Sequence, residues 1–360
     1  MQLRYSTEEI LADHPFVRLN SFGSKRLHGG FDADGTYRSP RTFGRWPAIE
    51  AWRQRLLDEG GELIDASTRI LHAPHYPNLA QMKLLLAAGV TLPLWNNLTT
   101  TGIIEGRGKM LAQITAPDFQ PLVEEDISET ATAHLNRGLF VAHGLDEGGD
   151  GVSDVGAHDQ MWYLARDLVL GENAHPIPEI PERAGRPGSE GREMPQLPIP
   201  HEMLVKQLMN ILMIEIRAER GFAFNVALMR DPEAFADRRV DAERAATIID
   251  QIRQDEASHV AYLQLFISEL RRFHFKTPTG SVEGASFIDP VWAKIVAWNA
   301  DNVPRTGAEA TRALVANCLK NRSDGAALLA RFDALGDEAQ LASVSSAAGR
   351  AKAGSPVTSA

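Results

Sequence analysis

The clearest pattern of apolar and polar positions lies between Val240 and Arg271, in a stretch without proline or glycine. Apolar residues recur there every three or four positions, which is typical of one face of a helix. They are Ala245, Ile248, Ile249, Ile252, Leu263, Phe266, Ile267 and Leu270. Glu256 and His259 fall where this apolar stripe should continue. The pattern therefore predicts a long helix that points a carboxylate and an imidazole, one turn apart, into the protein core.

Three other stretches have the periodicity of long helices. They run from Pro121 to about Gly144, from Ser153 to Leu170 and from His201 to Met229. Gly148–Gly151 predicts a turn between the first two, and Arg230–Pro232 ends the third. Residues 172–200 contain seven prolines, so they cannot form one continuous helix. This order, two helices, a long connection and two more helices, is the layout of a four-helix bundle with one long crossover.

The sequence therefore divides into four parts. We expect residues 119–273 to form the bundle, with the crossover at 171–200. Residues 1–118 predict an extension of short helices and loops that packs on the bundle. Residues 274–342 predict C-terminal helices, at Asp289–Asn299 and Thr306–Asn321. Residues 343–360 are rich in Ala, Ser and Gly and are predicted to be disordered.

The polar residues on the apolar stripes predict a metal site. A buried carboxylate normally needs a partner or a metal, and Glu-x-x-His gives one metal ion two ligands from a single helix face. Such bundles combine a lone Glu from each of two helices with Glu-x-x-His from each of the other two. Glu215 interrupts an apolar run at a height that matches Glu256, and Glu219, one turn on, is the alternative.

The first half of the chain repeats this pattern. Glu172 and His175 form a second Glu-x-x-His, and Glu129 is its partner by height, so the lone Glu precedes the motif by 43 residues here and by 41 in the second half. However, Pro176 follows the motif and disfavours helical geometry at His175. The alternative ligands are His158 and Asp159, nearer the start of the same helix. His143 is about level with His158 across the turn, whereas His134 is expected at the surface or the core edge.

Charge indicates how many ions such a site would hold. Four carboxylates in an apolar core would repel one another, and two divalent cations would neutralise them. Oxygen and imidazole ligands suit a pair of iron ions, with manganese or a mixed manganese–iron pair as the alternative. The simplest competing interpretation is an ordinary bundle in which these Glu residues pair with Arg217, Arg220 or Arg253.

Composition excludes several other classes of protein. The net charge of −10 argues against nucleic acid or an anionic membrane as the main partner. Cys318 is the only cysteine, so disulfides within the chain and cysteine metal sites are excluded. No apolar run reaches transmembrane length, and a cytoplasmic location is expected. Five basic residues, Lys25, Arg26, Arg38, Arg41 and Arg45, predict either a solvated loop face or a contact with an anion.

With this doubled ligand motif, residues 119–273 resemble the ferritin-like di-metal carboxylate superfamily. The resemblance implies a mainly α, ferritin-like bundle in which Glu129, Glu172, His175, Glu215, Glu256 and His259 bind two irons, and the reduced pair activates O₂. The residues outside the bundle favour a dimeric oxygenase or oxidase with a small organic substrate and an electron-donor protein. The alternatives are a ferroxidase or metal-handling protein without an organic substrate, and a metal-free helical interaction protein. Tyr163 and Tyr262 are candidates for storing a radical.

Overall fold

The computed structural model describes residues 3–180, 186 and 191–337, and it is mainly helical with little sheet. The predicted disordered tail, 343–360, lies outside the described residues. The helices are α1 Thr7–Ile10, α2 Arg45–Asp58, α3 Leu79–Ala87, α4 Leu92–Gly108, α5 Ala131–His134, α6 Phe140–Gly148, α7 His158–Leu170, α8 Ile199–Arg230, α9 Arg239–Arg272, α10 Ala285–Ala297 and α11 Val303–Leu319. The strands are β1 Arg18–Phe22, β2 Lys25–Phe31, β3 Tyr37–Arg38, β4 Val155–Gly156, β5 His274–Thr277 and β6 Gly280–Glu283. The prediction of a mainly helical protein is confirmed.

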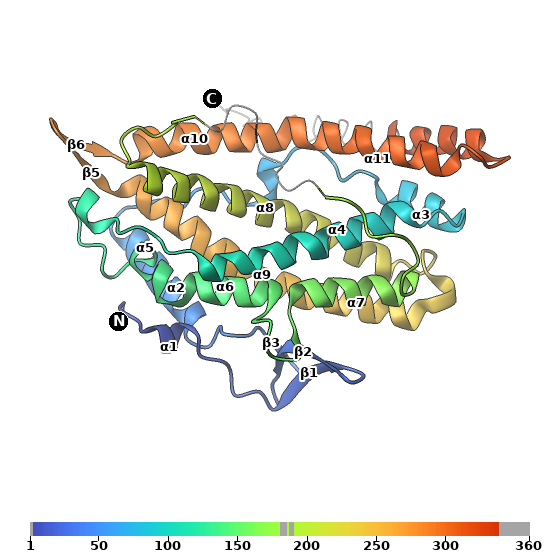
Figure 1. Cartoon of the computed structure of the whole chain (residues 1–360), viewed down its shortest axis with the longest axis horizontal. Coiled ribbons are helices and arrows are strands. Elements are labelled where there is room, and N and C mark those ends of the chain that lie inside the picture. Colours follow the sequence, from blue (N-terminus) through green and yellow to red (C-terminus); the bar gives the residue numbers. More distant parts are fainter. Residues whose placement is uncertain (1–2, 181–185, 187–190, 338–360) are drawn as a thin grey trace, which may run out of the picture.

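The two longest helices, α8 and α9, pack against each other along the length of the molecule (Figure 1). Their bounds agree with the stretches predicted from apolar periodicity. Asp241 lies in the first turn of α9 and Arg271 and Arg272 in the last, which suits the charge of each end of the helix dipole. The short connection between α8 and α9 makes them antiparallel, so matching heights on the two helices face each other.

The first two predicted helices do not form the antiparallel pair that the sequence predicted. Instead of turning back, α6 and α7 follow each other nearly end to end (Figure 1). The helix that packs along both of them is α4, which lies in the predicted N-terminal extension. The predicted helix from Pro121 also begins later, at Ala131, and is interrupted at Gly138, where φ is 113°. The paired segments are therefore α4 with α6 and α7, and α8 with α9.

Buried apolar residues form two cores along these helices. On α9, Ala245, Ile249 and Ile252 belong to one core and Leu263 and Phe266 to the other. The polar residues from Asp255 to His259 lie between the two cores, where the sequence interrupts its apolar stripe. This arrangement places a polar cluster in the middle of the helical layer.

A small sheet covers the cluster from one side. The hairpin of β1 and β2 is antiparallel, and β1 is its edge strand, while β2 also pairs with β3 and with β4. Because β4 leads directly into α7, its pairing with β2 sets the position of His158 at the start of that helix. The C-terminal elements α10 and α11 run along the opposite side of the molecule (Figure 1). None of the described helices is long and apolar enough to cross a membrane.

Candidate metal centre

Seven acidic and histidine side chains from five helices converge between the two cores. They are Glu105 on α4, His143 and Glu147 on α6, His158 on α7, Glu215 on α8, and Glu256 and His259 on α9. None of these residues is more than 7% exposed. They form two groups of four that could each hold a metal ion and that share Glu147.

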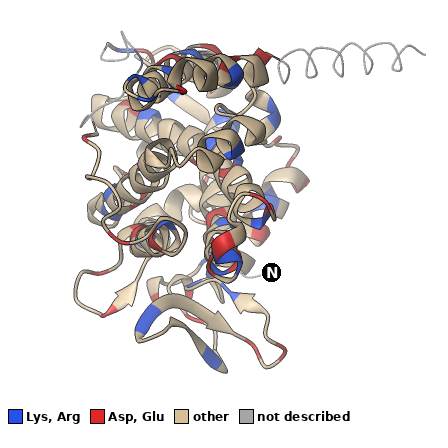
Figure 2. Ribbon diagram, turned by 90° about the vertical axis from the view of Figure 1, so that its right-hand side faces the viewer, with Lys and Arg blue, Asp and Glu red and all other residues tan. Residues whose placement is uncertain are grey.

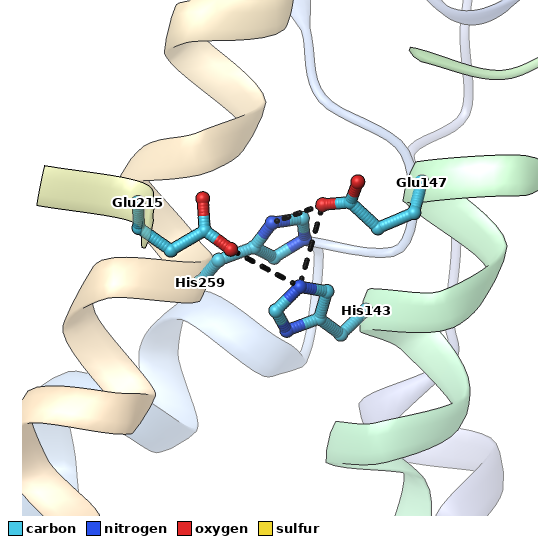
Figure 3. Close-up of side chains that lie close together, drawn as sticks. All are labelled: His143, Glu147, Glu215 and His259. Atoms are coloured by element: carbon cyan, nitrogen blue, oxygen red, sulfur yellow. Dashed lines mark ion pairs between the residues drawn. The ribbon is translucent and has the colours of Figure 1, made fainter. Parts of the chain in front are cut away.

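The first group consists of His143, Glu147, Glu215 and His259 (Figure 3). The Nε2 atom of His143 lies 3.3 Å from Oε1 of Glu147 and 3.4 Å from Oε1 of Glu215. The Nδ1 atom of His259 lies 3.3 Å from the same Glu147 oxygen. The two imidazole rings are stacked with their centroids 3.7 Å apart. Four donor atoms from three helices therefore face one point.

The second group consists of Glu105, Glu147, His158 and Glu256. The Nδ1 atom of His158 lies 2.8 Å from Oε1 of Glu256, 3.4 Å from Oε2 of Glu105 and 3.9 Å from Oε1 of Glu147. Its carboxylates therefore surround one histidine nitrogen. Glu147 belongs to both groups, and its Oε1 atom lies 3.3 Å from His143 and His259 and 3.9 Å from His158.

Each histidine uses its second ring nitrogen for a contact outside the cluster. The Nε2 of His259 lies 3.1 Å from Oδ2 of Asp146, and the Nε2 of His158 lies 3.3 Å from Oδ2 of Asp255. The Nδ1 of His143 lies 2.8 Å from the hydroxyl of Tyr262. Such outer partners fix the tautomer and orientation of histidines that bind metals.

Residues of the N-terminal segment hold both of these aspartates. Arg41 and Arg45 donate to Asp146, with Nη2 of Arg45 2.7 Å from Oδ2. Asp255 accepts from the Tyr37 hydroxyl at 3.0 Å and lies 2.8 Å from Nε2 of His28. Arg41 reaches its position with a φ of 52°, a left-handed conformation that is strained for arginine. The segment from β2 to α2 is thus part of the centre.

Burial and neighbouring charges together shift the pKa values of the carboxyl groups, and the net direction depends on the neighbours. The pKa values of Glu105 and Glu215 are raised well above their usual range by burial and by the neighbouring charges of Glu147 and Glu256. Burial also acts to raise the pKa of Glu256, but the adjacent His259 and His158 hold it well below its usual value. In the metal-free protein these shifts favour the protonated form of Glu105 and Glu215 and the ionised form of Glu256.

The pKa values of the three histidines are also shifted in different directions. Burial acts to lower the pKa values of His158 and His259, but Glu256 and the aspartates behind them raise both well above 6.5. His143 has its pKa lowered to about 4 by burial and by the charge of His259. Without metal, the shifts favour protons on His158, His259, Glu105 and Glu215, and bound cations would displace such protons.

The buried polar atoms and charges fit two divalent cations. Oε2 of Glu105, Nδ1 of His158 and Oε1 of Glu256 are buried and face one another at 2.8–3.4 Å, but among the described residues none of the three forms a hydrogen bond of good geometry. Orphaned atoms of this kind are costly unless a ligand satisfies them. With neutral histidines, the four glutamates, Asp146 and Asp255 carry six negative charges, and Arg41 and Arg45 neutralise two of them. Two divalent cations would balance the remaining four.

Three of the six ligands predicted from the sequence lie in this cluster, namely Glu215, Glu256 and His259. The structure does not bring the other three there. Glu129 lies at the surface beside Arg4 and Arg55, with its side chain 38% exposed. Glu172 is exposed, and Nε2 of His175 contacts the Thr91 hydroxyl at 2.8 Å. The physical reason is that α7 ends at Leu170, and Gly171 at φ 90° turns the chain away before the motif.

The alternative residues are also placed clearly. His143 and His158, which the sequence put at about the same height, both belong to the cluster. Glu219 pairs with Arg253 at 2.5 Å outside it, and His134 is buried elsewhere, accepting from the Tyr5 amide. Sequence reasoning missed Glu105 and Glu147. One available signal was the pair of Asp-Glu dipeptides at Asp146–Glu147 and Asp255–Glu256, because each combines a cluster glutamate with an outer aspartate.

Comparison with protein-family models, with curated proteins and with solved structures found no match. The function has to be inferred from the residues of the centre.

Proposed function

We propose that this protein is a non-haem diiron oxygenase or oxidase that uses O₂ to oxidise a small organic substrate. The observation that carries the proposal is that Glu147 belongs to two adjoining groups of buried ligands, each with at least one imidazole. A carboxylate shared by two ions is the central feature of a dinuclear site. The convergence of these side chains from α4, α6, α7, α8 and α9 supports a ferritin-like carboxylate bundle as part of the proposal.

The donor set favours iron. It contains four carboxylates and three imidazoles and no thiolate, since Cys318 lies on α11 outside the cluster. Carboxylate and imidazole ligands suit iron and manganese, and manganese or a mixed pair stays the alternative. Bound ferrous ions would supply the electrons for O₂ reduction, which the side chains of this protein cannot do.

The side chains around the ions would orient the ligands and handle protons. Asp146 and Asp255 keep the N–H of His259 and His158 pointing outward, so that the other ring nitrogen of each faces the ions. In the metal-free protein the raised pKa values of Glu105 and Glu215 favour protonated carboxyl groups, which would give up their protons when a cation binds. Two apolar cores flank the centre and exclude water, which strengthens its electrostatic interactions.

The first experiment is to load the purified protein with ferrous iron and measure bound metal per chain. We expect two ions in the wild-type protein. Glu147→Ala should lower this value strongly, because it removes the ligand shared by both groups. Glu129→Ala is the matched control, since Glu129 lies at the surface, and it should leave the metal content unchanged. Less than one ion per wild-type chain would favour the metal-free interaction protein.

The second experiment separates the two metal-dependent functions. O₂ consumption by the iron-loaded protein is followed with and without a panel of small organic molecules. Uptake stimulated by one of them, with formation of its oxidised product, is expected for an oxygenase or oxidase. Iron oxidation and mineral formation without such stimulation would instead identify a ferroxidase.

A further inference from the structure

The β1–β2 hairpin has a basic surface, although the chain as a whole is acidic. Residues 17–38 contain four basic residues and two acidic ones, in a protein of net charge −10. Figure 2 shows Lys and Arg positions on the strands of this sheet, at the bottom of the view. We call the exposed residues Val17, Arg18, Leu19, Lys25 and Arg26 the hairpin surface.

The positive charges of the hairpin surface are not used inside the protein. Arg18, Lys25 and Arg26 form no ion pair with any described residue, and Arg18 lies over the ring of Phe31. Of the acidic residues nearby, Asp32 pairs with Arg38, Asp34 accepts from the Thr36 amide, and Asp167 and Glu172 line a pocket with Lys25 without forming an ion pair with it. The three basic side chains are therefore available to an acidic partner.

Apolar side chains and an open sheet edge accompany this charge. Val17 and Leu19 are 70% and 46% exposed. Both flank Arg18, and Leu19 and Arg18 lie on β1, the edge strand of the sheet. Exposed apolar residues beside uncommitted charges are typical of surfaces that bind another protein.

Strand β2 connects the hairpin surface to the metal centre, because it carries residues of both. β2 begins with Lys25 and Arg26 and continues to His28, whose Nε2 lies 2.8 Å from Asp255. Asp255 in turn contacts His158, and the rings of His28 and His158 are 4.8 Å apart. The path from β2 to His158 therefore passes through one residue of α9, Asp255, or directly between the two rings. Short, continuous contacts of this kind connect the surface to the centre.

We propose that the hairpin surface docks an acidic, one-electron donor protein that reduces the metal centre. This inference rests on the proposed diiron function. Two donors arriving in succession each lose one electron, and together they reduce two ferric ions to two ferrous ions, with no bond made or broken at the surface. Opposite charge accelerates such encounters, and the positive surface lies where the route to His158 is shortest.

The first test measures binding without any reaction. Oxidised plant-type ferredoxin, a small acidic one-electron carrier, is titrated into the iron-loaded ferric protein by calorimetry at low and at high salt. We expect binding that weakens as the salt concentration rises. The variant Arg18→Glu, Lys25→Glu, Arg26→Glu should lose it. The matched control, Arg69→Glu, Lys320→Glu, Arg331→Glu, makes the same charge change at exposed residues outside the sheet and should bind like the wild type.

The second test measures reduction of the centre by stopped-flow absorbance. With reduced ferredoxin, the hairpin variant should react roughly tenfold more slowly than the wild type, or slower still. With dithionite, which needs no docking, the two proteins should react at the same rate. Equal rates with ferredoxin, or an equal loss in the control variant, would overturn the docking proposal while leaving the diiron function intact. Tighter binding of a DNA duplex than of ferredoxin would also overturn it, and failure to bind iron at all would remove both proposals.

Discussion

Asp255 and His158 come from different halves of the chain and meet in the core, with Oδ2 of Asp255 3.3 Å from Nε2 of the imidazole. The next residue, Glu256, contacts the other nitrogen of the same ring at 2.8 Å. The dipeptide Asp255–Glu256 therefore contacts both ring nitrogens of His158. The aspartate sets the orientation of the ring, and the glutamate lies beside the ring nitrogen that would bind a metal ion.

Replacing Asp255 with Asn should weaken metal binding without removing a ligand. Loss of an outer carboxylate of this kind typically costs about 10-fold to 100-fold in metal affinity. Competition with a chelator measures the effect. The control is Asp250→Asn on the same helix, where the carboxylate pairs with Arg230 and Arg253 away from the centre. Equal affinities in the two variants would show that Asp255 does not position His158.

Replacing Arg45 with Met should destabilise the protein. The Arg45 side chain is fully buried and donates to Asp146, and the substitution leaves this carboxylate with less compensation. Breaking a buried pair from one side typically costs about 3–5 kcal/mol in the free energy of unfolding. Urea denaturation measures the loss. Arg53→Met, on the exposed side of α2, should change stability by at most about 1 kcal/mol, and a similar loss in both variants would contradict the assignment.

Metal binding should release protons. Glu105, Glu215, His158 and His259 have pKa values raised well above their usual range, which favours the protonated forms that divalent cations must displace. The apparent metal affinity should consequently fall as the pH is lowered from about 8 to about 6. Calorimetry in two buffers with different ionisation enthalpies counts the protons. Identical binding enthalpies in the two buffers would refute the predicted release.

Glu269 should make stability depend on pH in the metal-free protein. Burial raises its pKa to about 7, although its carboxylate accepts from the amides of Ala131 and Thr132 and from the Thr132 hydroxyl. Between about pH 4.5 and about pH 7 the folded protein binds this proton and the unfolded chain does not, so the free energy of unfolding falls as the pH rises. The contribution of this group is about 3 kcal/mol at most.

Comparison with Glu269→Gln isolates this contribution, because glutamine cannot ionise. Urea denaturation across this pH range should give a steeper decline for the wild type than for the variant. Glu283→Gln, at an exposed position on β6, should retain the wild-type decline. Parallel curves for the wild type and Glu269→Gln would show that another group causes the pH dependence.

The cluster residues on α8 and α9, namely Glu215, Glu256 and His259, could be predicted from the sequence because their arrangement depends on local structure. The apolar stripe of α9 fixes the direction in which Glu256 and His259 point, since positions three apart lie on one helix face. The short connection between α8 and α9 then fixes the height of Glu215 opposite them. Helical periodicity and one short loop are enough to place these three residues together.

The full set of cluster residues on α4, α6 and α7 could not be predicted from the sequence, because a pattern along the chain does not show which helices pack together. The glycine-rich turn after α6 suggested an antiparallel return, but the chain continues in nearly the same direction into α7 (Figure 1). The position beside α6 and α7 is taken instead by α4, which contributes Glu105. The near-equal spacing of Glu129 to Glu172 and of Glu215 to Glu256, 43 and 41 residues, therefore does not correspond to a repeated ligand set in the structure.

The sequence by itself determined that this protein is mainly helical and that α9 carries a carboxylate and an imidazole into the core, because both follow from periodicity within one segment. Tertiary structure decided that Glu105, His143, Glu147 and His158 join them and that Arg41, Arg45, His28 and Tyr37 support the two aspartates behind them. These contacts join residues far apart in the chain. They depend on which helices and strands pack side by side, and packing is a property of the whole molecule.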